Sequence, residues 1–265
     1  MFDRFSLIAG PCLLESDELN LEVARALSGW SESFDLPVVF KASFDKANRS
    51  KLSAERGPGL EVGLEALARV KGETGLSVIT DIHEAGQAAR VAAVVDTLQI
   101  PAFLCRQTDL LVAVGETGRP VNLKKGQWMS PEEMAAAVNK LESSGAPEVA
   151  VTERGTFFGY GNLVVDMRSF ARGTKATGCP VYFDGTHSVQ RPGALDGASG
   201  GDPEHIPSLV RGAVAAGCAG LFLETHPRPE QAPSDGSNML PLEEMPQLLR
   251  NVQAVRAALA PEGAT

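Results

Sequence analysis

Short apolar runs recur along the chain and alternate with longer segments in which apolar residues return at helical spacing. The short runs lack polar alternation, which is typical of parallel strands that are buried on both faces. They predict strands at residues 5–9, 36–40, 76–80, 97–100, 121–123, 149–152, 180–183 and 220–223. The longer segments predict helices, as between Asp17 and Phe34, where Leu19, Val23 and Leu27 fall on one helical face.

This alternation predicts a single (β/α)8 TIM barrel that spans residues 1–265. An open doubly wound sheet is the alternative architecture. It is disfavoured because no Gly-x-Gly-x-x-Gly motif joins the first predicted strand to its helix. In a closed barrel the active site lies at the carboxyl ends of the strands. Residues at those ends are therefore the candidates for function.

Local signals mark several helix ends. Ser130, Pro131 and Glu133 form a capping-box pattern that predicts a helix start. Gly75 predicts the end of the helix that begins near Leu60. The glycine-rich segment 193–201 predicts a loop, followed by a helix that starts between residues 203 and 207.

Composition excludes several classes of partner. The net charge of -9 disfavours nucleic acid, because binding a phosphate backbone requires a broad basic surface. No apolar run approaches the roughly 20 residues that span a bilayer, and the first residues do not resemble a signal peptide. Four scattered cysteines indicate thiols and not a disulfide framework. We therefore expect a cytoplasmic protein with no membrane partner.

Cationic residues gather at the predicted strand ends, against the negative charge of the chain. The set is Lys41, Lys46, Arg49, Lys124 and Arg154, with Arg106 on a longer loop. Neutral donors such as Asn48 and Ser50 lie among them. A concave cationic site suits a substrate with several negative charges, for which phosphate and carboxylate are the natural groups. The alternative is that the cations pair with neighbouring carboxylates such as Asp81.

A second group of residues offers metal-binding atoms. Cys12, His187, Glu224 and Asp235 lie at or beyond the ends of the first, seventh and eighth predicted strands, which are adjacent in a closed barrel. Thiolate, imidazole and carboxylate ligands suit zinc, iron(II) or manganese. The alternatives are a packed cysteine and a hydrogen-bonded loop histidine. Other visible candidates are the histidines His83, His205 and His226.

Motifs along nearly the whole chain resemble the 3-deoxy-D-manno-octulosonate 8-phosphate synthase family. They include Gly10-Pro-Cys12, Lys41-Ala-Ser-Phe-Asp-Lys-Ala-Asn-Arg-Ser50, Arg56-Gly-Pro-Gly-Leu60, Thr80-Asp-Ile-His83, Asn122-Leu-Lys-Lys-Gly126, Phe158-Gly-Tyr-Gly-Asn-Leu-Val-Val-Asp166 and Glu224-Thr-His-Pro227. The related 3-deoxy-D-arabino-heptulosonate 7-phosphate synthases typically carry Lys-Pro-Arg-Thr in place of the residues 46–50 pattern. One departure is Lys51, where the family resemblance leads us to expect a second serine.

The resemblance implies a barrel, usually a homotetramer, that condenses phosphoenolpyruvate with arabinose 5-phosphate for lipopolysaccharide synthesis. It implies that phosphoenolpyruvate is held by Lys41, Lys46, Lys124, Arg154 and Gln99. It implies that the sugar phosphate is held by Asn48, Arg49 and Ser50, with Arg106 reaching in from a neighbouring subunit. The catalytic residues it suggests are Lys41, Lys46, Asn48, Asp81, Lys124 and His187.

The resemblance also assigns the metal ligands and leaves two alternatives for the function. In the metal-dependent branch of the family, the ligands are the residues that match Cys12, His187, Glu224 and Asp235. The metal-independent branch carries asparagine at the first position, so Cys12 indicates a divalent metal cofactor here. The alternatives are a synthase that uses erythrose 4-phosphate and a non-catalytic barrel that binds anions or metal.

Overall fold

Parallel strands close into a barrel in this computed structural model, which describes residues 1–49, 51, 53–159, 161–195 and 198–260. The barrel strands are β1 (Ser6–Gly10), β2 (Val38–Lys41), β3 (Ser77–Asp81), β4 (Thr97–Ile100), β5 (Val121–Lys124), β6 (Val149–Glu153), β9 (Val181–Asp184) and β12 (Gly220–His226). Neighbours pair in parallel in this order, and β12 pairs with β1 to close the ring. The predicted TIM barrel is confirmed.

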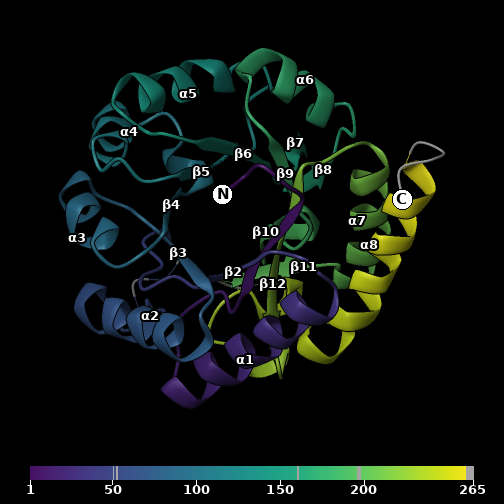
Figure 1. The fold of residues 1–265 in the computed structure, drawn as a ribbon, viewed down its shortest axis with the longest axis horizontal. Helices are drawn as coiled ribbons and strands as arrows, with labels where there is room; N and C mark the ends of the chain where they lie inside the picture. The colour runs from purple at the N-terminus through teal and green to yellow at the C-terminus, as the bar shows by residue number, and fades with distance from the viewer. Residues whose placement is uncertain (50, 52, 160, 196–197, 261–265) are drawn as a thin grey trace.

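Helices surround the strands on the outside of the barrel (Figure 1). They are α1 (Asp17–Ser33), α2 (Leu60–Thr74), α3 (Ala88–Ala92), α4 (Thr108–Gly115), α5 (Met134–Ser143), α6 (Ser169–Thr177), α7 (Ile206–Ala215) and α8 (Met245–Leu259). Short 3-10 helices are η1 (Ala85–Gln87), η2 (Ala102–Leu104), η3 (His187–Val189), η4 (Pro203–His205), η5 (Pro229–Gln231), η6 (Gly236–Asn238) and η7 (Leu242–Glu244). No helix in the described part of the chain is long and apolar enough to cross a bilayer.

The structure has the predicted helix end at Gly75 and the predicted capping box at Ser130, but the second helix begins later than predicted. Gly75 adopts a left-handed conformation (φ 69°) just after α2, which a glycine takes without steric cost. At the next predicted start, the Ser130 amide donates to the Glu133 carboxylate (2.7 Å) and the Glu133 amide donates to Ser130 Oγ (3.3 Å). These reciprocal bonds form the expected capping box. The regular helix α5 nevertheless begins only at Met134.

Two buried layers explain why the strands are mainly apolar. Every residue of the barrel strands is buried except Ser77. One layer fills the barrel interior and includes Ile8, Val39, Tyr182 and Phe222. The other lies between the strands and the helices, so alternate strand residues pack on opposite sides. Both sides are therefore shielded from water.

Local pattern missed several elements after β6. The antiparallel hairpin β7 (Thr156–Gly159) and β8 (Asn162–Val164) and the helix α6 were not predicted. The glycine-rich segment 193–201, expected as a loop, contains the end of β10 (Gln190–Leu195) and all of β11 (Ala198–Gly201). These two strands pair as an antiparallel hairpin, so that expectation is wrong. A two-residue strand, β13 (Leu240–Pro241), pairs with the end of β12. The hairpin β7–β8 is mostly exposed even at the apolar residues Phe157, Phe158 and Val164, so its sequence lacks the alternation of apolar and polar residues that predicts a half-buried strand.

The close packing at Gly220 leads to a stability prediction. A Cβ atom there would collide with the Tyr182 ring and lie 2.7 Å from the Ser6 carbonyl oxygen. Gly220→Ala should therefore lower the free energy of unfolding by about 1–3 kcal/mol, measured by urea denaturation. Gly72 is the matched control, since no atom lies within 4 Å of its added Cβ. Gly72→Ala, inside α2, should raise stability by roughly 0.5–1 kcal/mol. Equal stability of the Gly220→Ala protein and the unsubstituted protein would contradict the prediction.

Candidate active site

A cavity of about 200 Å³ opens at the carboxyl ends of the barrel strands. Many of the residues that the sequence singled out line it: Lys41, Lys46, Asn48, Asp81, Gln99, Lys124, Arg154, His187, Glu224 and Asp235. They come from strand ends that are far apart in the sequence and adjacent in the barrel. The tertiary structure thus brings together the polar residues predicted at the strand ends.

Lys41 lies at the centre of the buried charges. Its Nζ donates to Glu224 Oε1 at 2.8 Å and lies 3.7 Å from Asp81 Oδ2. Burial disfavours the ammonium charge, but Glu224 and Asp81 outweigh it and raise the pKa of Lys41 above its ordinary value. Burial likewise opposes ionisation of Glu224, yet the charge of Lys41 holds the pKa of that carboxyl below its ordinary value. The pair is therefore ionised, and here the carboxylate-pairing alternative is correct.

Asp81 ties three strand ends together. Its carboxylate accepts hydrogen bonds from Ser43 Oγ and Gln99 Nε2. Ser43 Oγ in turn accepts from Lys46 Nζ at 3.0 Å. Burial works against the charge on Asp81, but the neighbouring Lys41 and Lys46 ammonium groups lower the pKa of its carboxyl. Asp81 is thus ionised, and its carboxylate orients the side chains of Ser43 and Gln99 beside the cavity.

Lys124 and His187 share the carboxylate of Asp184. Lys124 Nζ donates to Asp184 Oδ2 and lies 3.3 Å from the centroid of the Phe222 ring. His187 Nδ1 lies 2.7 Å from the same oxygen. Burial lowers the pKa of Lys124 although Asp184 acts in the opposite direction. The Lys124 ammonium is therefore less fully compensated by carboxylates than the Lys41 ammonium. This difference favours an additional anion beside Lys124.

Arg154 is a buried cation with an incomplete set of partners. Its side chain sits at the end of β6, and the residue is 4% exposed. Nη2 donates to Gln190 Oε1 at 2.8 Å, whereas Nη1 has no hydrogen-bond partner within the described residues. Burial lowers the pKa of Arg154, but a guanidinium remains protonated in proteins. A buried charge with an unpaired donor is suited to binding an anion.

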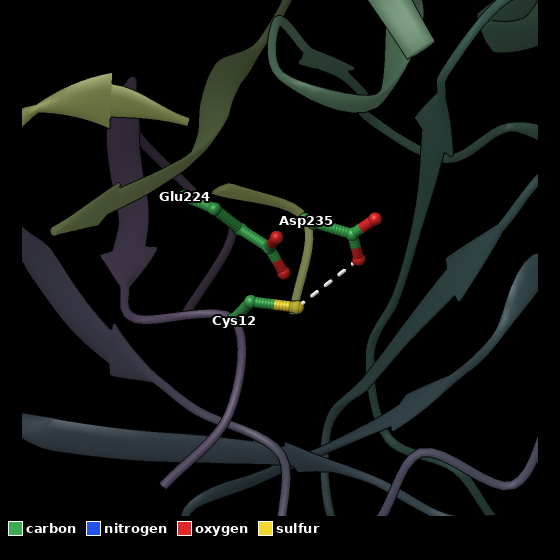
Figure 2. Close-up of side chains that lie close together, drawn as sticks. All are labelled: Cys12, Glu224 and Asp235. Atoms are coloured by element: carbon green, nitrogen blue, oxygen red, sulfur yellow. Dashed lines mark hydrogen bonds between the residues drawn. The ribbon is translucent and has the colours of Figure 1, made fainter. Parts of the chain in front are cut away.

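Three of the four predicted metal ligands converge beside the cavity. Figure 2 shows the side chains of Cys12, Glu224 and Asp235 pointing toward one another, and their ligand atoms all lie within 4.8 Å of each other. Cys12 Sγ lies 3.2 Å from Asp235 Oδ2. Burial, followed by the charge of Glu224, raises the pKa of the Cys12 thiol well above its ordinary value. A bound divalent cation would reverse that effect by stabilising the thiolate.

His187 borders this cluster without joining its closest group. Its Nε2 lies 3.6 Å from Glu224 Oε2. Because Asp184 holds Nδ1, the opposite ring nitrogen points toward the cluster, which is the usual support for a metal-binding histidine. The sulfur, carboxylate and imidazole donors together fit a borderline divalent metal. The ligand assignment itself stays a prediction.

Other predicted residues lie outside the cavity wall. Arg49 does not line the cavity, since its guanidinium donates to Ser234 Oγ at 2.9 Å and to the Glu55 carbonyl at 2.8 Å. Arg106 is exposed on the loop after β4 and also does not line it. Ser50 falls outside the described residues.

The remaining histidines and several unpredicted side chains are also placed. His226 Nε2 lies 3.1 Å from Glu15 Oε1, and His205 belongs to η4. His83 lines the cavity, and so do Gln127 and Gln190, which the sequence analysis did not select. Their nearness in sequence to Lys124 and His187 was the available signal. A neutral amide alone carries little predictive weight, so the signal was weak.

Comparison with known proteins identifies relatives over most of the chain. Residues 2–260 match the model of the DAHP synthetase I family. A protein of Syntrophotalea carbinolica named 2-dehydro-3-deoxyphosphooctonate aldolase is 53% identical over 204 residues, which cover 77% of this chain and 73% of the relative. A protein of the same name from Rhodopseudomonas palustris is 55% identical over 205 residues, covering 77% of this chain and 71% of the relative. A third, from Nitratidesulfovibrio vulgaris, is 54% identical over 207 residues, covering 78% and 76%.

Proposed function

The chain belongs to the DAHP synthetase I family, and on that basis we propose that it condenses phosphoenolpyruvate with D-arabinose 5-phosphate and water. The products are 3-deoxy-D-manno-octulosonate 8-phosphate and phosphate, in a step of lipopolysaccharide biosynthesis. The name shared by the relatives denotes this same synthase. The observation that carries the proposal is that Lys41, Lys124 and Arg154 line the same cavity.

The cavity chemistry supports the proposed binding of phosphoenolpyruvate. Its phosphate and carboxylate are anions with several acceptor oxygens, which match Arg154 Nη1, unpaired within the described residues, and the partly compensated ammonium of Lys124. Lys46 and Gln99 supply further donors on the same wall. Asn48, at the cavity edge, lies beside the site proposed for the sugar phosphate.

The reaction requires that two substrates be aligned and that negative charge be stabilised. The methylene carbon of phosphoenolpyruvate forms a bond to the aldehyde carbon of the sugar, whose oxygen gains a proton and becomes a hydroxyl. Water adds to the carbon that bears the phosphate ester, and phosphate leaves with the electrons of that carbon–oxygen bond. Fixed cations around the leaving phosphate would lower the barrier, and the buried ion pairs keep those cations in place.

A metal cofactor is part of the proposal. Cys12, Glu224, Asp235 and His187 would hold the divalent cation, and the donor set suits zinc, iron(II) or manganese. When bound, the cation supplies a Lewis acid near the reacting groups. In the same scheme Asp184 keeps the His187 ring in place through Nδ1.

Phosphate release tests the activity. Metal-replete protein should release phosphate from phosphoenolpyruvate when arabinose 5-phosphate is added, and much more slowly with erythrose 4-phosphate. Faster release with erythrose 4-phosphate would support the seven-carbon synthase. No release with either sugar would support a binding protein and overturn the proposed activity. The single-substrate mixtures are the controls, because the condensation requires both sugar and phosphoenolpyruvate.

Chelation and substitution of Cys12 test the metal. Chelator should abolish phosphate release and a divalent metal should restore it, while Cys12→Ala should lose both metal and activity because the remaining ligands hold the ion poorly. Cys12→Asn should retain measurable activity that chelator no longer changes, as in the metal-independent branch. Cys105→Ala is the control, because Cys105 is also buried but lies outside the cluster. The Cys105→Ala protein should keep its metal content. Full turnover by protein shown by elemental analysis to lack metal would contradict the assignment.

A homo-oligomer, by resemblance a tetramer, is the proposed assembly, and we propose a cytoplasmic location. Phe103, which lines the cavity, stacks on Trp128 with ring centroids 6.1 Å apart. The two side chains are 49% and 44% exposed. Exposed aromatic residues at a cavity mouth suit contact with another protein surface. Arg106 follows on the same loop, so a neighbouring copy could receive its guanidinium at the sugar phosphate site.

Substitution of Arg106 tests this shared site. Arg106→Ala should raise the KM for arabinose 5-phosphate roughly 10- to 100-fold, because a charged contact to phosphate is lost. The KM for phosphoenolpyruvate should change little. Arg250→Ala, at an exposed position on α8, is the control and should leave both values unchanged. An equal effect of Arg106→Ala on both substrates, or a monomer with full activity, would contradict the proposal.

A further inference from the structure

Gln190 joins two parts of the candidate active site that have different chemistry. It begins β10, directly after η3, and it lines the cavity. Its Oε1 accepts a hydrogen bond from Arg154 Nη2 at 2.8 Å, and its Nε2 donates to Asp235 Oδ1 at 3.0 Å. The reverse orientation of the amide would place donor against donor and acceptor against acceptor. The two partners therefore determine which end faces which residue.

At its oxygen end, Gln190 controls the plane of a guanidinium. The five N–H donors of arginine lie in one rigid plane, so holding one nitrogen directs the others. Gln190 holds Nη2, while Nη1 has no partner among the residues that the structure describes. The amide therefore orients Arg154 so that an anion can take up the remaining donor.

At its nitrogen end, Gln190 supports a residue with an uncommon backbone. Asp235 has a φ of 52°, in the left-handed region that favours glycine. Gln190 bonds Oδ1, and Asn238 Nδ2 adds a longer contact at 3.4 Å. Because these contacts are made to Oδ1, the other carboxylate oxygen, Oδ2, faces Cys12 Sγ.

We propose that Gln190 is a positioning residue for the reaction, which orients the Arg154 guanidinium toward phosphoenolpyruvate and the Asp235 carboxylate toward Cys12 and Glu224. The inference rests on the proposed function and extends it to a residue outside the predicted set. Gln190 acts through its neighbours, so its loss should chiefly weaken the binding of the substrate that Arg154 holds. A packing role would instead affect folding alone.

Kinetics of Gln190→Met separate these roles. Methionine has a similar length and volume but cannot make either hydrogen bond. The KM for phosphoenolpyruvate should rise on the order of 10-fold, the usual cost of one charged hydrogen bond, with the KM for arabinose 5-phosphate little changed. Gln247→Met is the matched control, because Gln247 Oε1 also accepts from an arginine, Arg250 Nη2 at 2.8 Å, but on the exposed face of α8. An unchanged KM for phosphoenolpyruvate in Gln190→Met would overturn the proposal.

A double-mutant cycle tests whether the effect passes through Arg154. Arg154→Lys keeps the charge but loses the planar fork that Gln190 holds. Adding Gln190→Met to Arg154→Lys should change the KM for phosphoenolpyruvate much less than it does in the unsubstituted protein. Fully additive effects would show that the two residues act independently, which overturns the proposed route.

Further measurements keep the inference separate from folding and from the proposed reaction. Gln190→Leu is the second variant if Gln190→Met does not fold. Failure of both to fold, with Gln247→Met folded, would assign Gln190 a packing role and overturn the proposal. If the unsubstituted protein releases no phosphate, the affinity of each protein for phosphoenolpyruvate alone, measured by calorimetry, still tests the role of Gln190. About 10-fold weaker binding by Gln190→Met supports positioning, whereas equal affinity or no binding by the unsubstituted protein overturns it.

Discussion

The buried ion pair between Lys41 and Glu224 is the constraint on which the active-site end of the barrel depends. A charge removed from water is costly unless an opposite charge and hydrogen bonds replace its hydration. Lys41 therefore requires Glu224 at 2.8 Å, and Asp81 adds a second carboxylate at 3.7 Å. Because β2, β3 and β12 carry these residues, neutralising the charges also fixes the relative positions of the three strand ends.

Around this balanced pair, the other cations are compensated to different degrees. Lys124 shares Asp184 with His187, and Arg154 relies on the neutral amide of Gln190 for its close contact. The gradient has a functional consequence, because an anion gains most where a buried cation lacks a partner. Lys41 is then a structural cation as well as a candidate for binding, whereas Arg154 has the clearest capacity for an incoming phosphate or carboxylate.

Glu224, which pairs with Lys41, also belongs to the cluster of Cys12, Glu224 and Asp235. Glu224 Oε1 accepts from Lys41, while Oε2 lies 3.6 Å from His187 Nε2. One carboxylate thus contacts both the cationic wall and the proposed metal ligands. This sharing explains why the two groups of residues, distinct in the sequence, form one continuous site in the folded chain.

The sequence by itself determined the barrel and most of the residues at its active-site end. A continuous apolar run such as residues 36–40 is typical of a strand buried on both faces, and the polar residue Lys41 follows that run directly. Tertiary structure decided what local pattern does not encode: that Lys41 pairs with Glu224, that Arg154 Nη1 has no partner among the described residues, and that Gln190 bridges Arg154 and Asp235. These contacts join residues many positions apart, so their distances and partners arise only when the ring of strands closes.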